Sequence, residues 1–411
     1  MNFGVTPTSF SVFSVSVICL FSGFYDYNYD NENKQMKDRI KELEKQAGNL
    51  ELEDGSRDKL LKKLITYSQH FLSNLNEDRA FNGSTDPVPH EIMDCFSDDP
   101  VDFEEILSQF DEHVLGNGIN GAHGGHLGYV PGGGLFPSAM GDFLAAITNR
   151  YAGVYFASPG AVTMEHGLID WMGSIFDLPE ESRGGTLTSG GSIANLLAVT
   201  TARDELDINS KNYEKITVYG TWQTHHCVDK AMKIAGLADA KLRRVPMDEE
   251  YRMDAGKLDG MINEDKNNGL IPLMIISTAG TTDMGVMDPL NDVAKVARNQ
   301  EVWYHVDAAY GGFFNLVDDL KPKFGGIEKA DSIVIDPHKS LFLPFGTGAF
   351  LIRDKHKLFE SQHVIADYMQ DTLDARYETS PADLSPELTR HYRGLRVWMP
   401  LKLFGLKPFK A

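Results

Sequence analysis

The apolar residues in the second half of the chain fall into short runs rich in β-branched residues, and stretches with helical spacing separate these runs. Six runs follow one another from about residue 183. They read GGTLTSGG, KITVYGT, LIPLMIISTAG, EVWYHVDAAYGG, SIVIDPHK and GTGAFLIRD. This alternation of strand and helix predicts an α/β fold with a mainly parallel sheet and helices on both faces. Ligands of such sheets bind at the carboxyl ends of the strands.

The first part of the chain has a different pattern. Residues 9–24 form an apolar run about as long as the hydrophobic region of a signal peptide, but no Lys or Arg precedes it. A targeting segment and an irregular extension both stay open for residues 1–33. Apolar residues at helical spacing then predict one or two amphipathic helices in an N-terminal helical segment at residues 34–120.

Composition and charge narrow the class of protein. The chain has 42% hydrophobic and 24% charged residues, as globular proteins do, and a formal net charge of −20. That charge repels nucleic acids and anionic membranes, so we expect neither as a partner. Cys19, Cys95 and Cys227 lie far apart, without a C-x-x-C pair or a disulfide framework. These features favour a reducing, cytoplasmic location.

Two glycine-rich motifs could bind phosphate groups. In TSGGSIANLL, residues 190–192 stand between a strand and a helix, where small residues and free N–H groups can hold an anion. An ordinary glycine turn with Ser192 as the helix cap explains the same letters, so both interpretations stay open. GNGING, residues 116–121, matches the dinucleotide pattern G-x-G-x-x-G. No strand precedes it and no helix follows, which excludes a dinucleotide site.

Asp307 and Lys339 are the strongest candidates for chemistry, since each follows an apolar strand. A buried aspartate needs a cationic or hydrogen-bonding partner. A lysine that forms a Schiff base and an aspartate that keeps a pyridine nitrogen protonated are what a pyridoxal phosphate site requires. His225 could lie flat on the cofactor ring, and a capping or core histidine is the alternative. The neighbouring His226 does not make a metal site, because no further ligand stands at the required spacing.

These motifs, in this order, resemble the group II pyridoxal phosphate-dependent amino-acid decarboxylases, which include the aromatic-L-amino-acid, histidine and glutamate decarboxylases. The likeness runs from HGGHLGYVPGGGLFPSAMGDFL through ASPGAVTMEHGLIDWMGSIFDLP to LTRHYRGLRVWMPLKLFGLKPF. The resemblance implies the type I aminotransferase-like fold with a seven-stranded sheet, and a homodimer. It also implies a large cofactor-binding domain at residues 121–400, and residues 401–411 as the start of a small C-terminal domain that is missing.

The resemblance also assigns roles to individual residues. Lys339 in DPHK would form the Schiff base, and Asp307 in HVDAAYGG would pair with the pyridinium nitrogen. His225 would stack on one face of the ring, with Ala309 under the other. The remaining residues implied around the phosphate and along the site are Gly191, Ser192, His338, Thr278 and Asp336.

The implied reaction is decarboxylation of an L-amino acid, an aromatic one, to its amine and carbon dioxide. Relatives that release amines carry a loop tyrosine that delivers the last proton. Here Leu384 stands at that position when SPELTR is aligned, and Tyr377 is the nearby substitute. An aldehyde-forming reaction therefore stays open. The predicted substrate residues are Tyr129 and Val130. Since Val130 replaces an expected phenylalanine, glutamate or diaminobutyrate stays open as the substrate.

Two other classes of protein remain as alternatives. An aminotransferase or another lyase of the same fold would need an arginine for the substrate α-carboxylate, and Arg390, Arg393 and Arg396 are available. A truncated relative with impaired activity, or a non-catalytic cofactor-binding protein, is the second alternative.

Overall fold

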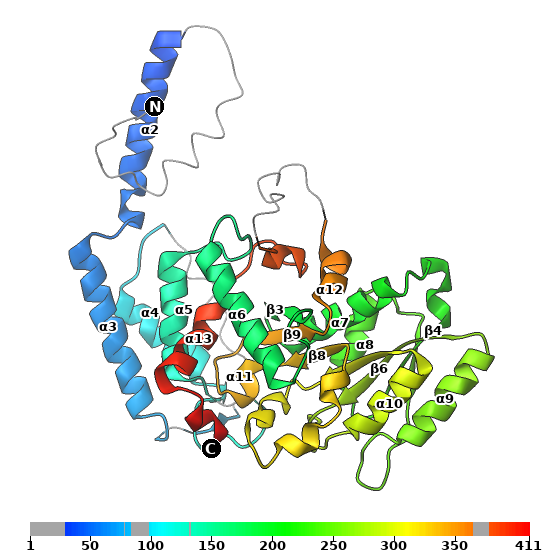
Figure 1. Ribbon diagram of the computed structural model, residues 1–411. Helices are drawn as coiled ribbons and strands as arrows, with labels where there is room; N and C mark the ends of the chain where they lie inside the picture. The colour runs from blue at the N-terminus through cyan, green and yellow to red at the C-terminus, as the bar shows by residue number, and fades with distance from the viewer. Residues whose placement is uncertain (1–28, 78, 84–97, 131–132, 365–377) are drawn as a thin grey trace. The chain divides into compact units, whose positions relative to one another are not determined.

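The computed structural model describes residues 29–77, 79–83, 98–130, 133–364 and 378–411 (Figure 1). The apolar run at residues 9–24 and Tyr377 lie outside these residues. The chain divides into two compact units, Met1–Gly118 and Ile119–Ala411. In the described part, no helix combines the length and the apolar character needed to cross a membrane.

The first unit is helical. Its two long helices are α2 (Tyr29–Ala47) and α3 (Asp54–Ser73), in the segment for which the sequence predicts one or two helices. Lys63 on α3 forms an ion pair with Glu104 on α4. The shorter elements are η1 (Gly48–Leu50), β1 (Phe81–Asn82), α4 (Phe103–Phe110), the π-helical turn η3 (Asp111–Leu115) and β2 (Gly118–Ile119), which crosses the unit boundary.

A seven-stranded sheet forms the centre of the second unit, in the order β3-β9-β8-β7-β6-β4-β5. Only β9 runs antiparallel to its neighbours, β3 and β8. The strands are β3 (Gly184–Thr188), β4 (Ile216–Gly220), β5 (Lys241–Arg244), β6 (Ile271–Thr278), β7 (Trp303–Asp307), β8 (Ser332–Ile335) and β9 (Gly348–Ile352). The predicted mainly parallel, seven-stranded sheet is confirmed.

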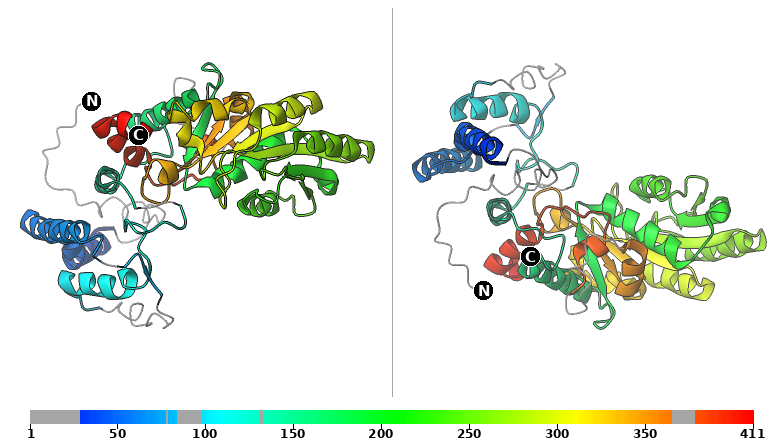
Figure 2. Two further views of the ribbon diagram at one scale, coloured as in Figure 1. Left: turned by 90° about the horizontal axis from the view of Figure 1, so that it is seen from below. Right: turned by 90° about the horizontal axis from the view of Figure 1, so that it is seen from above.

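Helices cover both faces of this sheet (Figure 2). The helices of this unit are α5 (Phe136–Thr148), α6 (Pro159–Ile175), α7 (Gly191–Glu205), α8 (Cys227–Ile234), α9 (Ala255–Asn267), α10 (Leu290–Gln300), α11 (Pro337–Ser340), α12 (Lys355–Gln362) and α13 (Gly394–Phe404). Of these, α5 packs on α13 rather than on the sheet. Short 3₁₀ turns lie at η4 (Ser210–Lys215), η5 (Gly312–Leu316), η6 (Lys321–Phe324), η7 (Ile327–Lys329), η9 (Pro381–Asp383) and η10 (Lys407–Lys410).

The alternation of side chains along the strands explains why both faces need cover. On β9, Phe350 and Ile352 pack in a buried cluster with residues of α7, α8 and α12. Ala349 and Leu351 belong to the cluster on the other face, with residues of α6, α9 and α10. A strand that is apolar on both sides is typical of a sheet buried between two helical layers.

The register of the central strands brings polar residues to one edge of the sheet. Thr278, at the end of β6, pairs with Asp307, at the end of β7, and Asp307 pairs with Val334 on β8. Asp336 and Lys339 follow one and four residues after β8 ends at Ile335. Parallel neighbours therefore deliver these side chains to the same place.

Candidate active site

A cavity of about 350 Å³ lies at the carboxyl ends of the parallel strands. The loops after β3, β4, β6, β7 and β8 all contribute to its walls. All the residues predicted to hold the cofactor line it: Gly191, Ser192, His225, Thr278, Asp307, Ala309, Asp336, His338 and Lys339. The structure thus brings together residues that are spread over more than a third of the sequence.

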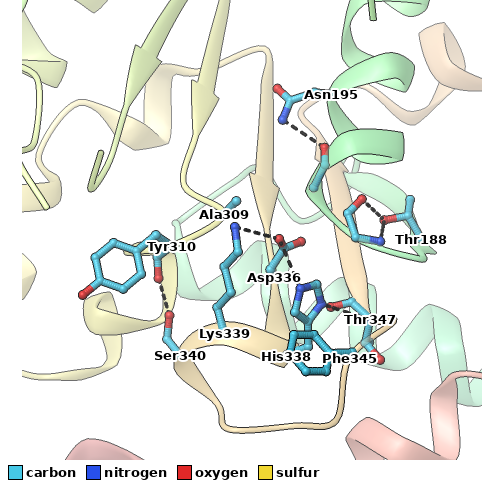
Figure 3. Close-up of polar contacts among 12 residues, drawn as sticks. Thr188, Asn195, Ala309, Tyr310, Asp336, His338, Lys339, Ser340, Phe345 and Thr347 are labelled. Carbon is cyan, nitrogen blue, oxygen red and sulfur yellow. Dashed lines mark hydrogen bonds and ion pairs between the residues drawn. The ribbon is translucent and has the colours of Figure 1, made fainter. Parts of the chain in front are cut away.

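Lys339 is fixed by the turn that follows β8. Asp336 leaves the strand in an extended conformation, Pro337 opens the one-turn helix α11, and Lys339 lies on that turn. The Lys339 Nζ lies 3.2 Å from Asp336 Oδ2 (Figure 3). Burial raises the pKa of Asp336, although Lys339 and His338 act against this rise. The lysine amine therefore points into the cavity, held by a buried carboxylate.

The start of α7 forms a narrow cradle beside this lysine. Gly190 has φ of 154°, and the Thr188 hydroxyl donates to its carbonyl over 3.1 Å. A Cβ placed on Gly191 would lie 3.0 Å from Asp336 Oδ2. Glycine avoids this crowding, and the first N–H groups of a long helix face an anion favourably. The geometry therefore fits a phosphate group.

Asp307 is buried at the end of β7 and accepts two hydrogen bonds. Ala309 N donates to Oδ1 over 3.1 Å, and Asn195 Nδ2 donates to Oδ2 over 3.3 Å. Two donors on opposite oxygens fix the plane of the carboxylate. The carboxylate can accept a further hydrogen bond from a protonated ring nitrogen.

His225 follows β4 and is half-buried at the wall of the cavity. Its Nδ1 accepts a hydrogen bond from Cys227 N over 3.2 Å, so a neutral ring carries its proton on Nε2. Burial lowers the pKa of His225, and the neighbouring His226 lowers it further. The two rings lie 4.1 Å apart between centroids.

The arginines that an aminotransferase would need are already paired. Arg390 Nη2 lies 3.1 Å from Glu165 Oε2, and both side chains are almost fully buried. Arg393 forms a two-pronged pair with Glu387. Arg396 binds Asp142 through Nε. In the described part of the chain, no arginine lines the cavity.

Other predicted residues are not gathered here. Tyr129 is 83% exposed and Val130 is 48% exposed, and neither lines the cavity, so their role in substrate binding stays a prediction. Leu384 is buried in an apolar cluster, also away from the cavity. The proposed proton donor Tyr377 lies outside the described residues.

Sequence reasoning missed Asn195 and His305, which lie behind Asp307. Asn195 Nδ2 also donates to Gly191 O over 2.9 Å, and His305 Nε2 lies 3.0 Å from Asn195 Oδ1. Spacing offered a weak signal. Asn195 stands one helical turn after Gly191, and His305 stands two residues before Asp307 on the same face of β7.

The residues of this cavity fit pyridoxal phosphate. A lysine amine can bond to its aldehyde, the aspartate to its ring nitrogen, the imidazole to its ring face and the glycine cradle to its phosphate. Glycine at position 191 lets the start of α7 approach the other cavity residues closely, since a Cβ there would lie 3.0 Å from Asp336 Oδ2 and 3.3 Å from Ala309 Cβ.

Comparisons with known proteins agree with this fit. Residues 89–411 match the family described as the pyridoxal-dependent decarboxylase conserved domain. An aromatic-L-amino-acid decarboxylase of Bacillus atrophaeus is 32% identical over 79% of this chain and 68% of its own length. A phenylacetaldehyde synthase of Petunia hybrida is 28% identical over 75% of this chain and 63% of its own length.

Solved structures give the same result for the fold. The structure of Oryza sativa TDC with PLP and tryptamine superposes with a TM-score of 0.82 at 24% identity, over 87% of this chain and 76% of that chain. The likeness confirms the predicted type I fold. The chain spans 63% to 68% of the length of the two curated relatives above.

Proposed function

Since the chain belongs to the pyridoxal-dependent decarboxylase family, we propose that it removes the α-carboxylate of an L-amino acid as carbon dioxide and releases the amine. Pyridoxal phosphate is the cofactor of this family. One observation carries the proposal: Lys339, Asp307 and the glycine cradle share a cavity that no described arginine lines.

The residues that would hold the cofactor follow from the cavity. Gly191, Ser192 and His338 would bind the phosphate, and Asp307 would bind the ring nitrogen. His225 and Ala309 would cover the two faces of the ring, with Thr278 at its edge. When bound, pyridoxal phosphate supplies an electron-withdrawing ring that can accept the electron pair of a broken bond.

The chain's own residues then favour loss of carbon dioxide. A carboxylate becomes a neutral molecule when it leaves, so a cationic partner would stabilise the starting state more than the transition state. The three nearby arginines bind Glu165, Glu387 and Asp142 instead. His225, whose pKa burial lowers, can present a neutral Nε2–H to the substrate rather than a full charge.

We propose an aromatic L-amino acid as the substrate. The support is the aromatic-L-amino-acid decarboxylase among the relatives and two aromatic side chains, Tyr310 and Phe345, in the cavity wall. Glutamate or a diamino acid is the alternative, and a mixed substrate pool separates them.

An aldehyde-forming reaction is the second candidate function. Its support is the phenylacetaldehyde synthase among the relatives, together with Leu384 in place of the expected tyrosine. Leu384 has no group that can donate a proton. Without a donor at that position, molecular oxygen would accept the two electrons that remain after carbon dioxide leaves and become hydrogen peroxide, and water would then release ammonia and the aldehyde.

We also propose that the protein is a cytoplasmic homodimer that binds neither nucleic acid nor membrane. The cysteine pattern and the net charge of −20 support the location and the absence of those partners. An apolar row on α5 supports the dimer, since its side chains need cover. These side chains are Phe136, Met140, Phe143, Leu144 and Ile147, each more than 40% exposed.

The deciding experiment incubates the 411-residue chain with pyridoxal phosphate and a pool of aromatic, acidic and basic L-amino acids, and identifies products by mass spectrometry. We expect one amine, absent from Lys339→Ala and retained by Lys295→Ala. Lys295 is an exposed lysine on α10 paired with Asp292, which makes it the matched control. An aldehyde would favour the second candidate. A keto acid, or an amine still formed by Lys339→Ala, would contradict both.

A further inference from the structure

A line of buried polar side chains runs along the face of the sheet that α7 covers and ends at Asp307. Trp303 Nε1 and His305 Nδ1 each lie 2.9 Å from Ser332 Oγ. His305 Nε2 lies 3.0 Å from Asn195 Oδ1, and Asn195 Nδ2 lies 3.3 Å from Asp307 Oδ2. The line therefore joins β7, β8 and α7 without a break.

The direction of these hydrogen bonds follows from the Asp307 end. The Asp307 carboxylate and the Gly191 carbonyl can only accept, so the Asn195 amide must turn its Nδ2 toward both. Asn195 Oδ1 then faces His305 and needs a donor. His305 Nε2 must carry the proton.

The hydrogen bonds at the Trp303 end of the line have the same direction. Burial lowers the pKa of His305 to about 4, so the ring is neutral and carries one proton only. Its Nδ1 is then an acceptor, and the Ser332 hydroxyl is the donor that faces it. Ser332 Oγ still accepts from the Trp303 N–H. Every donor in the line points toward Asp307.

We propose that Trp303, Ser332, His305 and Asn195 are positioning residues that fix the cofactor site through Asp307 and Gly191. This inference rests on the proposed function, because it assigns these residues to the binding of pyridoxal phosphate. Asn195 is the central member, since one amide group bonds both to the carboxylate for the ring nitrogen and to the cradle for the phosphate.

A role in packing alone does not explain the line. Buried polar groups cost free energy unless they are fully paired, and an apolar set of the same size would stabilise the fold at least as well. The neighbours on α7, Ala194, Leu197 and Ala198, are all apolar and buried. Thr201, the other polar residue among those buried on α7, has a hydroxyl without a hydrogen-bond partner in the described part of the chain, whereas both polar atoms of the Asn195 amide are paired.

The test compares substitutions that keep one N–H donor of the line with substitutions that remove it. His305→Gln keeps a donor where Nε2–H stands, whereas His305→Leu keeps the bulk and removes the donor. Asn195→Asp keeps the shape and replaces the donor with an acceptor. Tyr219→Phe is the matched control, because it removes a buried hydroxyl bonded to Thr217 and Asp265, away from the cavity.

Three quantities are measured on the 411-residue chain. They are the dissociation constant for pyridoxal phosphate, the pH at which the visible absorbance of the bound cofactor changes, and the urea unfolding of the cofactor-free protein. We expect His305→Leu and Asn195→Asp to weaken binding about ten-fold or more and to move the absorbance change along the pH axis. The dissociation constant of His305→Gln for pyridoxal phosphate should stay within about three-fold of that of the unsubstituted parent chain, and Tyr219→Phe should bind as the parent does.

Several results would overturn the inference. Binding and absorbance like those of the parent in Asn195→Asp would do so. So would equal losses of pyridoxal phosphate affinity in His305→Gln and His305→Leu, or an equally large loss in Tyr219→Phe. If His305→Leu does not fold, Asn195→Asp decides alone. A parent chain that folds but binds no pyridoxal phosphate would refute the proposed function as well. A parent chain that binds it, with unaffected variants, would refute only this inference.

Discussion

His305 makes the stability of the protein depend on pH. Its pKa falls from the ordinary 6.5 to about 4 because the ring is fully buried. The unfolded chain therefore takes up a proton at a pH where the folded chain does not. This contribution is fully present above about pH 6.5 and is lost as the pH falls toward about 4. At about 1.4 kcal/mol for each pH unit, it amounts to about 3 kcal/mol in total.

Urea unfolding of the cofactor-free protein between about pH 7 and about pH 5 measures this effect, and over that range the loss should be about 2 kcal/mol. His305→Gln is the reference, because glutamine does not titrate. Other groups, such as Asp288 with a pKa raised by burial to about 6, titrate in both proteins and cancel in the difference. Equal pH dependence in the two proteins would refute the reasoning.

Three further substitutions test the packing around the site. Glu165→Gln leaves the buried Arg390 without its counter-charge and should lower the free energy of unfolding by about 3 to 5 kcal/mol in urea, whereas a loss under about 1 kcal/mol would contradict a buried ion pair. Gly191→Ala puts a Cβ 3.0 Å from Asp336 Oδ2 and should weaken pyridoxal phosphate binding about ten-fold in a titration; unchanged binding would argue against the cradle. Gly185→Ala drives a Cβ into the carbonyl of Phe350 at a φ of 145° and should cost about 3 kcal/mol or more by thermal unfolding, and a parent-like midpoint would contradict that contact.

The sequence predicted the central strands and the cavity residues because both follow from short-range rules. Apolar β-branched runs predict strands, and the carboxyl ends of parallel strands meet, so Asp307 and Lys339 could be brought together without a structure. The hydrophobic pattern did not predict the strand β5 (Lys241–Arg244). It is short and charged, lies at the edge of the sheet, and none of its residues is fully buried.

The support behind Asp307 could not be predicted, because it depends on contacts across the fold. Asn195 and His305 are 110 residues apart and meet only when α7 packs on β7. Spacing gives a weak signal that Asn195 lies near Gly191 and His305 near Asp307, but none for the contact between Asn195 and His305. The ion pairs of Arg390 with Glu165 and of Arg396 with Asp142 also join distant parts of the chain, so the sequence could not predict them. The pair of Arg393 with Glu387 joins residues that are close in the sequence.

The place of β9 in the sheet has a consequence for biosynthesis. β3 lies at the edge of the described sheet, with β9 as its neighbour, and Thr188 pairs with Gly348, which the ribosome adds 160 residues later. Gly348 also touches the cradle, since a Cβ there would lie 2.6 Å from Gly190 Cα. At about 5 to 20 residues per second, the glycine loop waits on the order of ten seconds for its support. A nascent chain halted before Gly348 should therefore not retain pyridoxal phosphate, because the cofactor cannot be held until β9 has been made.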